Sequence, residues 1–267
     1  MKKKITALCL CVALLAVAVV GASLAYFTDT DSRDNVFTTG SVKIELIEKQ
    51  RDGEGGLEDF VDGKILLPIV GSAQDEKDEL GLSTAKNYVD KIVTVKNLAV
   101  DAYVRVYMAI PSALFNLDDE THNVLHVNQP GKETFVGLDG TTQNKWDKWS
   151  DMKRVGTYTD DDGVEYVVVY TTYADVLTED EIAGSAAFVG VYLDKGVDCD
   201  KNGNYIISYT EKTDSDEEVK VVREINYDIS KGVTLPVFAV GVQADGFTSA
   251  DEAIEAAFGA NYNPWAA

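Results

Sequence analysis

The alternation of apolar and polar residues predicts β-strands along most of the chain. Residues 41–47, Ser-Val-Lys-Ile-Glu-Leu-Ile, follow the two-residue period of a half-buried strand. Other runs are rich in Val, Ile, Tyr and Phe and are bounded by Gly, Asn or Asp, which is typical of strands between turns. These runs are residues 91–97, 102–108, 157–159, 166–170, 187–193, 205–209, 219–227 and 233–242.

Short connections restrict how these strands are joined. Residues 97–101 are too few for a helical crossover, so the strands on either side either pair antiparallel or cross between two sheets. Residues 160–163, Asp-Asp-Asp-Gly, predict a hairpin turn because glycine readily adopts positive φ. We expect a second pair of strands between residues 187–193 and 205–209.

Two segments depart from the strand pattern. Pro68 lacks a main-chain donor, so residues 64–70 are expected to form an edge strand or an extended segment. Residues 248–259 predict a short helix that ends on a glycine, with Ser249 and Glu252 at the spacing of a capping box.

Regularly spaced strands without long helices between them predict an all-β fold. We expect an antiparallel β-sandwich, jelly-roll-like, with a short C-terminal helix and decorated loops. The chain has no tandem repeat and no proline-rich linker, so residues 26–267 are expected to form one domain.

The first 25 residues have the composition of a secretion signal. Lys2 to Lys4 are followed by an uncharged, mainly aliphatic run over residues 5–25. Ser23 and Ala25 put small residues where a signal peptidase reads them, so we expect cleavage between Ala25 and Tyr26. The alternative is an uncleaved membrane anchor, since about 20 apolar residues can span a bilayer.

Charge and cysteine content narrow the classes of function. The 267 residues carry a formal net charge of −21, which disfavours binding to nucleic acid or to an anionic membrane surface. Membrane contact is therefore expected only through an uncleaved signal. Cys9 and Cys11 lie inside the signal, so the exported chain keeps only Cys199 and forms no internal disulfide.

The N-terminal region resembles a known family. After the lysines and the aliphatic run come Ala-Tyr-Phe-Thr-Asp at residues 25–29 and Phe-Thr-Thr-Gly-Ser-Val at residues 37–42. This order is similar to the signal and mature start of the TasA and camelysin family, whose members are exported by the signal peptidase SipW. The likeness covers roughly residues 1–46, recurs weakly at residues 93–106 and 242–247, and does not extend over residues 111–228.

The resemblance implies a secreted structural protein of an extracellular biofilm matrix or cell surface. After cleavage, the freed N-terminal segment of one subunit would dock as a strand in the next, with Tyr26, Phe27, Val36 and Phe37 as apolar anchors. The expected partners are another copy or a related fibre subunit, and a SipW-like peptidase. The alternatives are a monomeric surface-binding module or adhesin, and a camelysin-like metallopeptidase.

The residues do not support a catalytic role. His122 and His126 have the spacing of an H-E-x-x-H zinc motif, but Asn123 replaces the glutamate, so we predict that the protein is not an enzyme. A G-x-S-x-G elbow and a glycine-rich phosphate loop are also missing from the sequence.

Three further candidates have both a functional and a structural interpretation. Asp198, Asp200 and Asn202 match the first half of a calcium loop, but Tyr209 stands where the loop needs glutamate. They predict either a hairpin turn or a weak calcium site, and calcium is the one cofactor considered. Cys199 is either an inert thiol or a site of intermolecular pairing. The tryptophans are expected either to stack on a bound sugar or to pack in the core or against another subunit: Trp146, Trp149 and Trp265.

Overall fold

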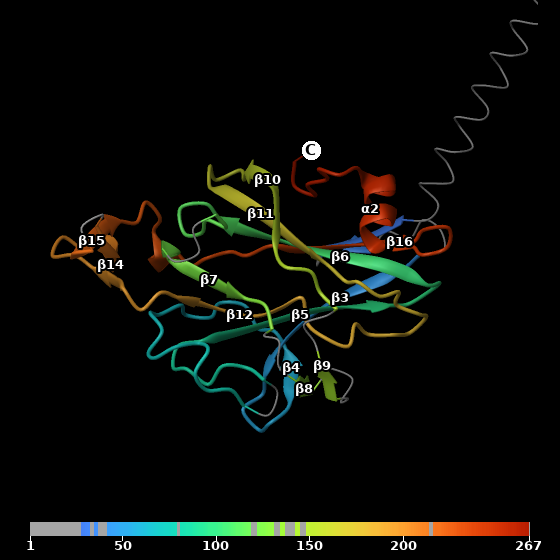
Figure 1. Ribbon diagram of the computed structural model, residues 1–267, viewed down its shortest axis with the longest axis horizontal. Helices are drawn as coiled ribbons and strands as arrows, with labels where there is room; N and C mark the ends of the chain where they lie inside the picture. The colour runs from blue at the N-terminus through green and yellow to red at the C-terminus, as the bar shows by residue number, and fades with distance from the viewer. Residues whose placement is uncertain are drawn as a thin grey trace, which may run out of the picture.

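The computed structural model describes residues 28–32, 35–36, 42–78, 81–118, 122–130, 134–136, 142–144, 148–213 and 216–266. It confirms an all-β fold built from two antiparallel sheets with a short C-terminal helix (Figure 1). Sheet A has the order β10-β11-β6-β16-β1-β2, and sheet B has the order β4-β3-β5-β12-β7. A three-stranded sheet, β13-β14-β15, projects from one end, and β8 and β9 form a separate pair.

The strands of sheet A are β1 (Thr28–Ser32), β2 (Asn35–Val36), β6 (Ala102–Pro111), β10 (Lys153–Thr159), β11 (Glu165–Thr172) and β16 (Val237–Gln243). Those of sheet B are β3 (Ile44–Arg51), β4 (Leu57–Asp59), β5 (Val89–Asn97), β7 (Leu125–Asn128) and β12 (Phe188–Leu193). The remaining elements are β8 (Thr134–Val136), β9 (Thr142–Asn144), β13 (Val197–Cys199), β14 (Tyr205–Lys212), β15 (Glu218–Glu224), the 3-10 turn η2 (Ile229–Lys231) and α2 (Ala250–Phe258).

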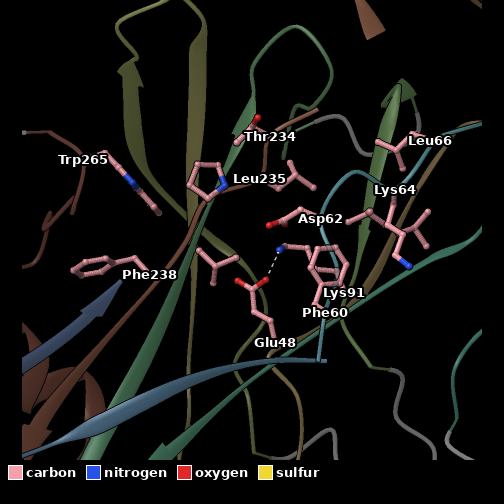
Figure 2. A pocket seen from close by; sticks show the side chains of 14 residues that line it. Glu48, Phe60, Asp62, Lys64, Leu66, Lys91, Thr234, Leu235, Phe238 and Trp265 are labelled. Atoms are coloured by element: carbon pink, nitrogen blue, oxygen red, sulfur yellow. Dashed lines mark hydrogen bonds and ion pairs between the residues drawn. The ribbon is translucent and has the colours of Figure 1, made fainter. Parts of the chain in front are cut away.

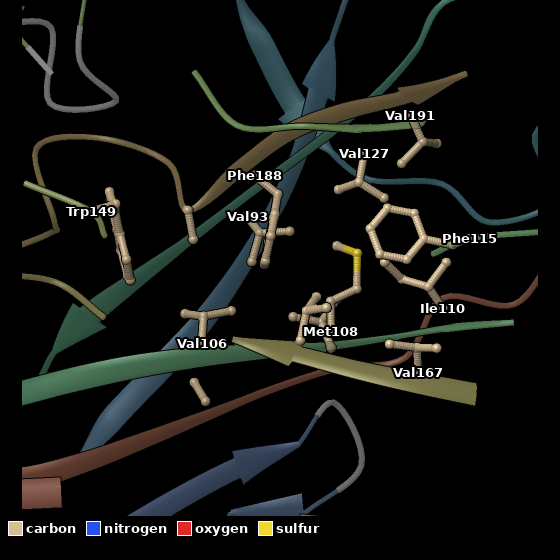
Figure 3. Close-up of a cluster of buried hydrophobic side chains, with 14 of the residues drawn as sticks. Val93, Val106, Met108, Ile110, Phe115, Val127, Trp149, Val167, Phe188 and Val191 are labelled. Atoms are coloured by element: carbon tan, nitrogen blue, oxygen red, sulfur yellow. The ribbon is translucent and has the colours of Figure 1, made fainter. Parts of the chain in front are cut away.

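The main core lies between the two sheets. Successive side chains of a strand point to opposite faces, and every second residue of β6 faces sheet B. Met108 is fully buried there, close to Ile110 and to Phe188 of β12 (Figure 3). Full burial of one such side chain stabilises the fold by about 1.5–3 kcal/mol, so this layer supplies much of the stability.

The opposite face of sheet A is also covered. Tyr103, Tyr107 and Ala109 of β6 belong to a second core with Ala253 and Ile254 of α2. Strand β6 is therefore buried on both faces, which explains why residues 102–111 are almost continuously apolar.

The predicted helix forms with its predicted cap. The hydroxyl of Ser249 accepts a hydrogen bond of 3.2 Å from the main-chain N–H of Glu252, and Gly259 ends the helix with φ 91°. The carboxylate of Glu252 accepts from the N–H of Thr248 at 2.9 Å rather than from Ser249. In a standard capping box this carboxylate would accept from the N–H of the cap residue, Ser249; here it accepts from the residue before the cap.

The connection between β5 and β6 crosses between the sheets, the second of the two arrangements expected for it. Asn97, fully buried at the end of β5, donates from its amide to the carbonyl oxygens of Val100 and Leu177, each at 2.9 Å. These bonds give the two main-chain carbonyl groups a hydrogen-bond partner and hold the connection between the sheets in place.

One predicted pairing is wrong. Strand β12 pairs with β5 and β7, whereas β14 pairs with β13 and β15. The short β13 was not anticipated, and it forms the tight hairpin with β14 that residues 187–193 were expected to form. The segment 233–242 also becomes a strand only from Val237, directly after Pro236.

The segment around Pro68 is extended, as predicted. It touches sheet B through one bridge between Pro68 and Leu193 and through a hydrogen bond of 3.0 Å from Ile69 N–H to the Leu193 carbonyl. Among the described residues, none of the helices has the length and apolar character needed to cross a lipid bilayer.

Candidate functional site

The N-terminal strand lies at one edge of sheet A. Strand β1 pairs antiparallel with β16 over five residues, from Thr28 opposite Val242 to Ser32 opposite Phe238. Strand β2 folds back onto β1 and forms the outer edge, with Val36 opposite Asp31. Figure 1 shows these blue strands beside β16, at the side of the sheet away from β10.

The strand that receives β1 is firmly held. On its other side β16 pairs with β6 along its whole length, from Val237 opposite Met108 to Gln243 opposite Ala102. Gly241 lets sheet B pack closely, because a Cβ atom there would lie 2.8 Å from a methyl carbon of Ile44. Strand β16 is therefore held by β6 and by sheet B as well as by β1.

The structure adds a segment that the sequence analysis missed. Residues 28–32, Thr-Asp-Thr-Asp-Ser, show no apolar alternation, so they gave no strand signal. The predicted anchors Tyr26, Phe27 and Phe37 lie outside the described residues, and Val36 is described only as part of β2. The predicted signal, including Ser23 and Ala25, lies outside them as well.

Residues 61–70, in the connection that follows β4 along the chain, form an apolar strip with exposed side chains. Of the seven large apolar side chains that are exposed in the described part of the chain, four belong to residues 61–70: Val61, Ile65, Leu67 and Val70. Ile65 is 79% exposed. Clustered exposure of this kind is typical of a contact surface rather than of a free face.

Of the candidate calcium residues, Asp200 and Asn202 lie in the hairpin turn between β13 and β14, and Asp198 lies in β13 opposite Ile206. One carboxylate oxygen of Asp200 accepts from the N–H groups of Asn202 and Asn204, at 2.8 and 2.9 Å. These main-chain bonds, led by that from Asn204, hold the pKa of Asp200 below its usual value. Asp198 instead accepts from the N–H of Cys199, so the two carboxylates each serve the local backbone.

The same turn occurs at two other hairpins. Asp160 accepts from the N–H of Asp162 and of Val164, at 3.0 and 2.8 Å, and Gly163 has φ 82° as predicted. Asp52 accepts in the same way from Glu54 and Gly56. This repetition favours the turn interpretation of Asp200, because three loops of different sequence use the carboxylate alike.

The two histidines lie against different carboxylates. His126 of β7 lies 3.3 Å from a carboxylate oxygen of Asp194 and stacks on Tyr192, while His122 lies 3.7 Å from Glu211 of β14. Burial alone would raise the pKa of Asp194, but hydrogen bonds from His126 and from a main-chain N–H lower it overall. Among the described residues no group of three or more metal-binding side chains comes together.

Of the remaining candidate residues, one tryptophan lies in the core, and the other described ones lie at the surface. Trp149 is buried, and its indole N–H donates to the carbonyl oxygen of Ser185 at 2.9 Å, so it packs the core. Trp265 is half-buried and lines a groove, and Cys199 is an exposed free thiol. Trp146 lies outside the described residues.

No family model matches this chain, and neither a curated protein nor a solved structure shows significant similarity to it.

Proposed function

We propose that this protein is an exported structural subunit that assembles into an extracellular fibre by donating its N-terminal strand to a second copy. The observation that supports the proposal most directly is the pairing of β1 with β16 at the edge of sheet A. Strand β1 and the two-residue β2 outside it are the last two strands at this edge, so they can leave together without displacing any other strand. The resemblance of residues 1–46 to the TasA and camelysin family agrees with this role.

The composition of β1 favours exchange. Its five residues are all polar, so its contribution to stability comes largely from main-chain hydrogen bonds, at about 1 kcal/mol each. The same bonds form when an identical strand from another copy occupies β16. Exchange between copies is therefore nearly neutral in energy, and protein concentration and added contacts decide which form prevails.

The apolar strip of residues 61–70 offers such an added contact. Its exposed side chains would be withdrawn from water in an assembly, at about 25 cal/mol for each Å² buried. Because donor edge and acceptor edge are different surfaces, each copy can donate to one neighbour and accept from another. Contacts of this head-to-tail kind produce open filaments.

A cysteine pair placed in register tests the proposal. In a Cys199→Ser background, Thr30→Cys and Val240→Cys put thiols at directly opposed positions of β1 and β16. The chain from Tyr26 onward contains every described residue and would be assembled, oxidised and run on a non-reducing gel. We expect a ladder of linked copies and filaments by electron microscopy.

The matched control joins Thr30→Cys to Val222→Cys, an exposed position on β15 that is not a partner of β1. It should give no ladder. The proposal fails if the Thr30–Val240 pair closes only within single chains, or if the chain from Tyr26 stays monomeric by light scattering at high concentration.

A further inference from the structure

A groove opens between the two sheets, next to the end of β16 at which Phe238 pairs with Ser32 of β1. It has a volume of about 570 Å³, within the range of small-molecule sites. Sheet B supplies one wall through Glu48 of β3 and Lys91 of β5, and sheet A supplies the other through Phe238 of β16. The segment after β4 and the C-terminal tail close its sides with Phe60 and Trp265 (Figure 2).

Aromatic rings form two sides of the groove. Trp265 stacks on Tyr158 with ring centres 5.6 Å apart, and Tyr158 stacks in turn on Tyr166 at 5.0 Å. Phe238 meets Trp265 edge-on at 6.1 Å. Trp265 is thus held in one orientation by its neighbours, which makes it a rigid apolar platform at the groove wall.

The floor of the groove is an ion pair. The ammonium of Lys91 donates to the carboxylate of Glu48 at 2.9 Å, and the two side chains are only 8% and 9% exposed. The same ammonium lies 4.6 Å from the ring centre of Phe60. Figure 2 shows Asp62 turned toward this pair. Donor and acceptor groups therefore stand side by side, next to aromatic surface.

The charges lining the groove balance. Glu48 and Asp62 are opposed by Lys64 and Lys91, although the chain as a whole carries a net charge of −21. A groove without net charge does not attract a charged ligand, and the surrounding acidic protein repels an anion. A neutral ligand with hydroxyl groups matches it, because each hydroxyl both donates and accepts hydrogen bonds.

An apolar occupant fits less well. A lipid chain or an apolar peptide would cover the Glu48–Lys91 pair without bonding to it, and charges so desolvated are costly. A sugar ring combines hydroxyl groups with a C–H face that stacks on an aromatic ring. We infer that this groove binds a neutral oligosaccharide, stacked on Trp265 and hydrogen-bonded to the Glu48–Lys91 pair.

Binding is tested on the chain from Tyr26 with a panel of neutral oligosaccharides: cellotetraose, maltotetraose and mannotetraose. Trigalacturonic acid serves as the anionic probe. Saturation-transfer NMR reports which sugar protons contact the protein, and titration gives Kd. We expect at least one neutral tetrasaccharide to bind and trigalacturonic acid to bind at least about tenfold more weakly.

Two variants localise the site. Trp265→Ala removes the platform, and Glu48→Gln with Lys91→Met removes the ion pair while keeping side-chain size. Each should weaken binding about tenfold or more while the circular dichroism spectrum stays unchanged, and Val222→Ala on β15 should have no effect. If the double variant unfolds, Trp265→Ala decides alone.

The inference is overturned if no neutral sugar of the panel binds, if the anionic probe binds equally well, or if Trp265→Ala leaves Kd unchanged. It is also overturned if Trp265→Ala prevents assembly without any sugar binding, because the groove would then hold a second copy. Failure of the Thr30–Val240 experiment does not affect it.

Discussion

Arg105 on β6 and Asp251 on α2 form an ion pair in which a guanidinium nitrogen donates to the carboxylate at 2.6 Å. Arg105 is 1% exposed and is the one charged residue of β6. It also donates to the hydroxyl of Thr172 at 2.8 Å and lies over the ring of Tyr170 at 4.3 Å. The pair thus fixes the helix to the outer face of sheet A.

Asp251→Ala is expected to lower the free energy of unfolding by about 2 kcal/mol. The change leaves a buried guanidinium without its carboxylate, which costs more than the loss of an exposed pair. Glu255→Ala is the matched control, because Glu255 lies exposed on the same helix, and it should change stability by less than about 0.5 kcal/mol. Urea unfolding followed by circular dichroism measures both, and equal effects would contradict the assigned role.

The stabilising effect of Asp251 should depend on pH. Burial would raise the pKa of Asp251, but the hydrogen bond and charge of Arg105 outweigh it and hold that pKa below its usual value. A carboxyl with a lower pKa in the folded state contributes stability above its unfolded pKa, about 3.9, and loses it as the pH falls through the folded value.

The difference in unfolding free energy between the wild-type protein and Asp251→Ala should therefore be full at pH 7 and shrink below about pH 4. Urea unfolding at a series of pH values tests this. A difference that stays constant down to the acid transition would show that Asp251 acts through packing alone.

Gly196→Ala should destabilise the three-stranded sheet. A Cβ atom at this position would lie 2.1 Å from the carbonyl oxygen of Ser208 in β14, and a main-chain atom cannot turn aside as a side chain can. Overpacking of this kind costs about 1–3 kcal/mol. Hydrogen exchange should show faster exchange of β13 to β15, while Lys195→Ala, an exposed neighbour, should leave the rates unchanged. Equal rates in both variants would contradict the close approach.

Two substitutions distinguish whether Asp200 stabilises a turn or binds calcium. Asp200→Asn keeps an oxygen that accepts the N–H groups of Asn202 and Asn204, so we expect the wild-type Tm. Asp200→Ala removes this acceptor and should lower Tm. Thermal unfolding with and without calcium provides the measurement. A rise in Tm with calcium that is lost in Asp200→Asn would establish metal binding instead.

Local sequence patterns were sufficient to predict those elements that depend only on residues close together in the chain. The two-residue period located β3, and runs rich in Val, Ile, Tyr and Phe located β5, β6, β11 and β12. The Asp-Gly pair located the turn between β10 and β11, and the cap of Ser249 located the start of α2. Each depends on the geometry of adjacent residues, so one sequence is sufficient to recognise it.

The groove and the strand edge could not be located in this way. Phe60, Lys91, Phe238 and Trp265 come from four distant segments, and no spacing in the chain connects them. The all-polar β1 becomes a strand only because β16 offers a free edge to its main chain, which accepts almost any sequence.

By itself, the sequence determined the longer apolar strands, the Asp-Gly turn, the helix cap and the acidic character of this protein. Only the tertiary structure decided which strands pair, that Arg105 meets Asp251 across 146 residues, and that a charge-balanced groove opens between the sheets. The physical reason is that backbone geometry and side-chain period act over short range, whereas strand pairing and packing depend on which surfaces of the whole chain can be buried together.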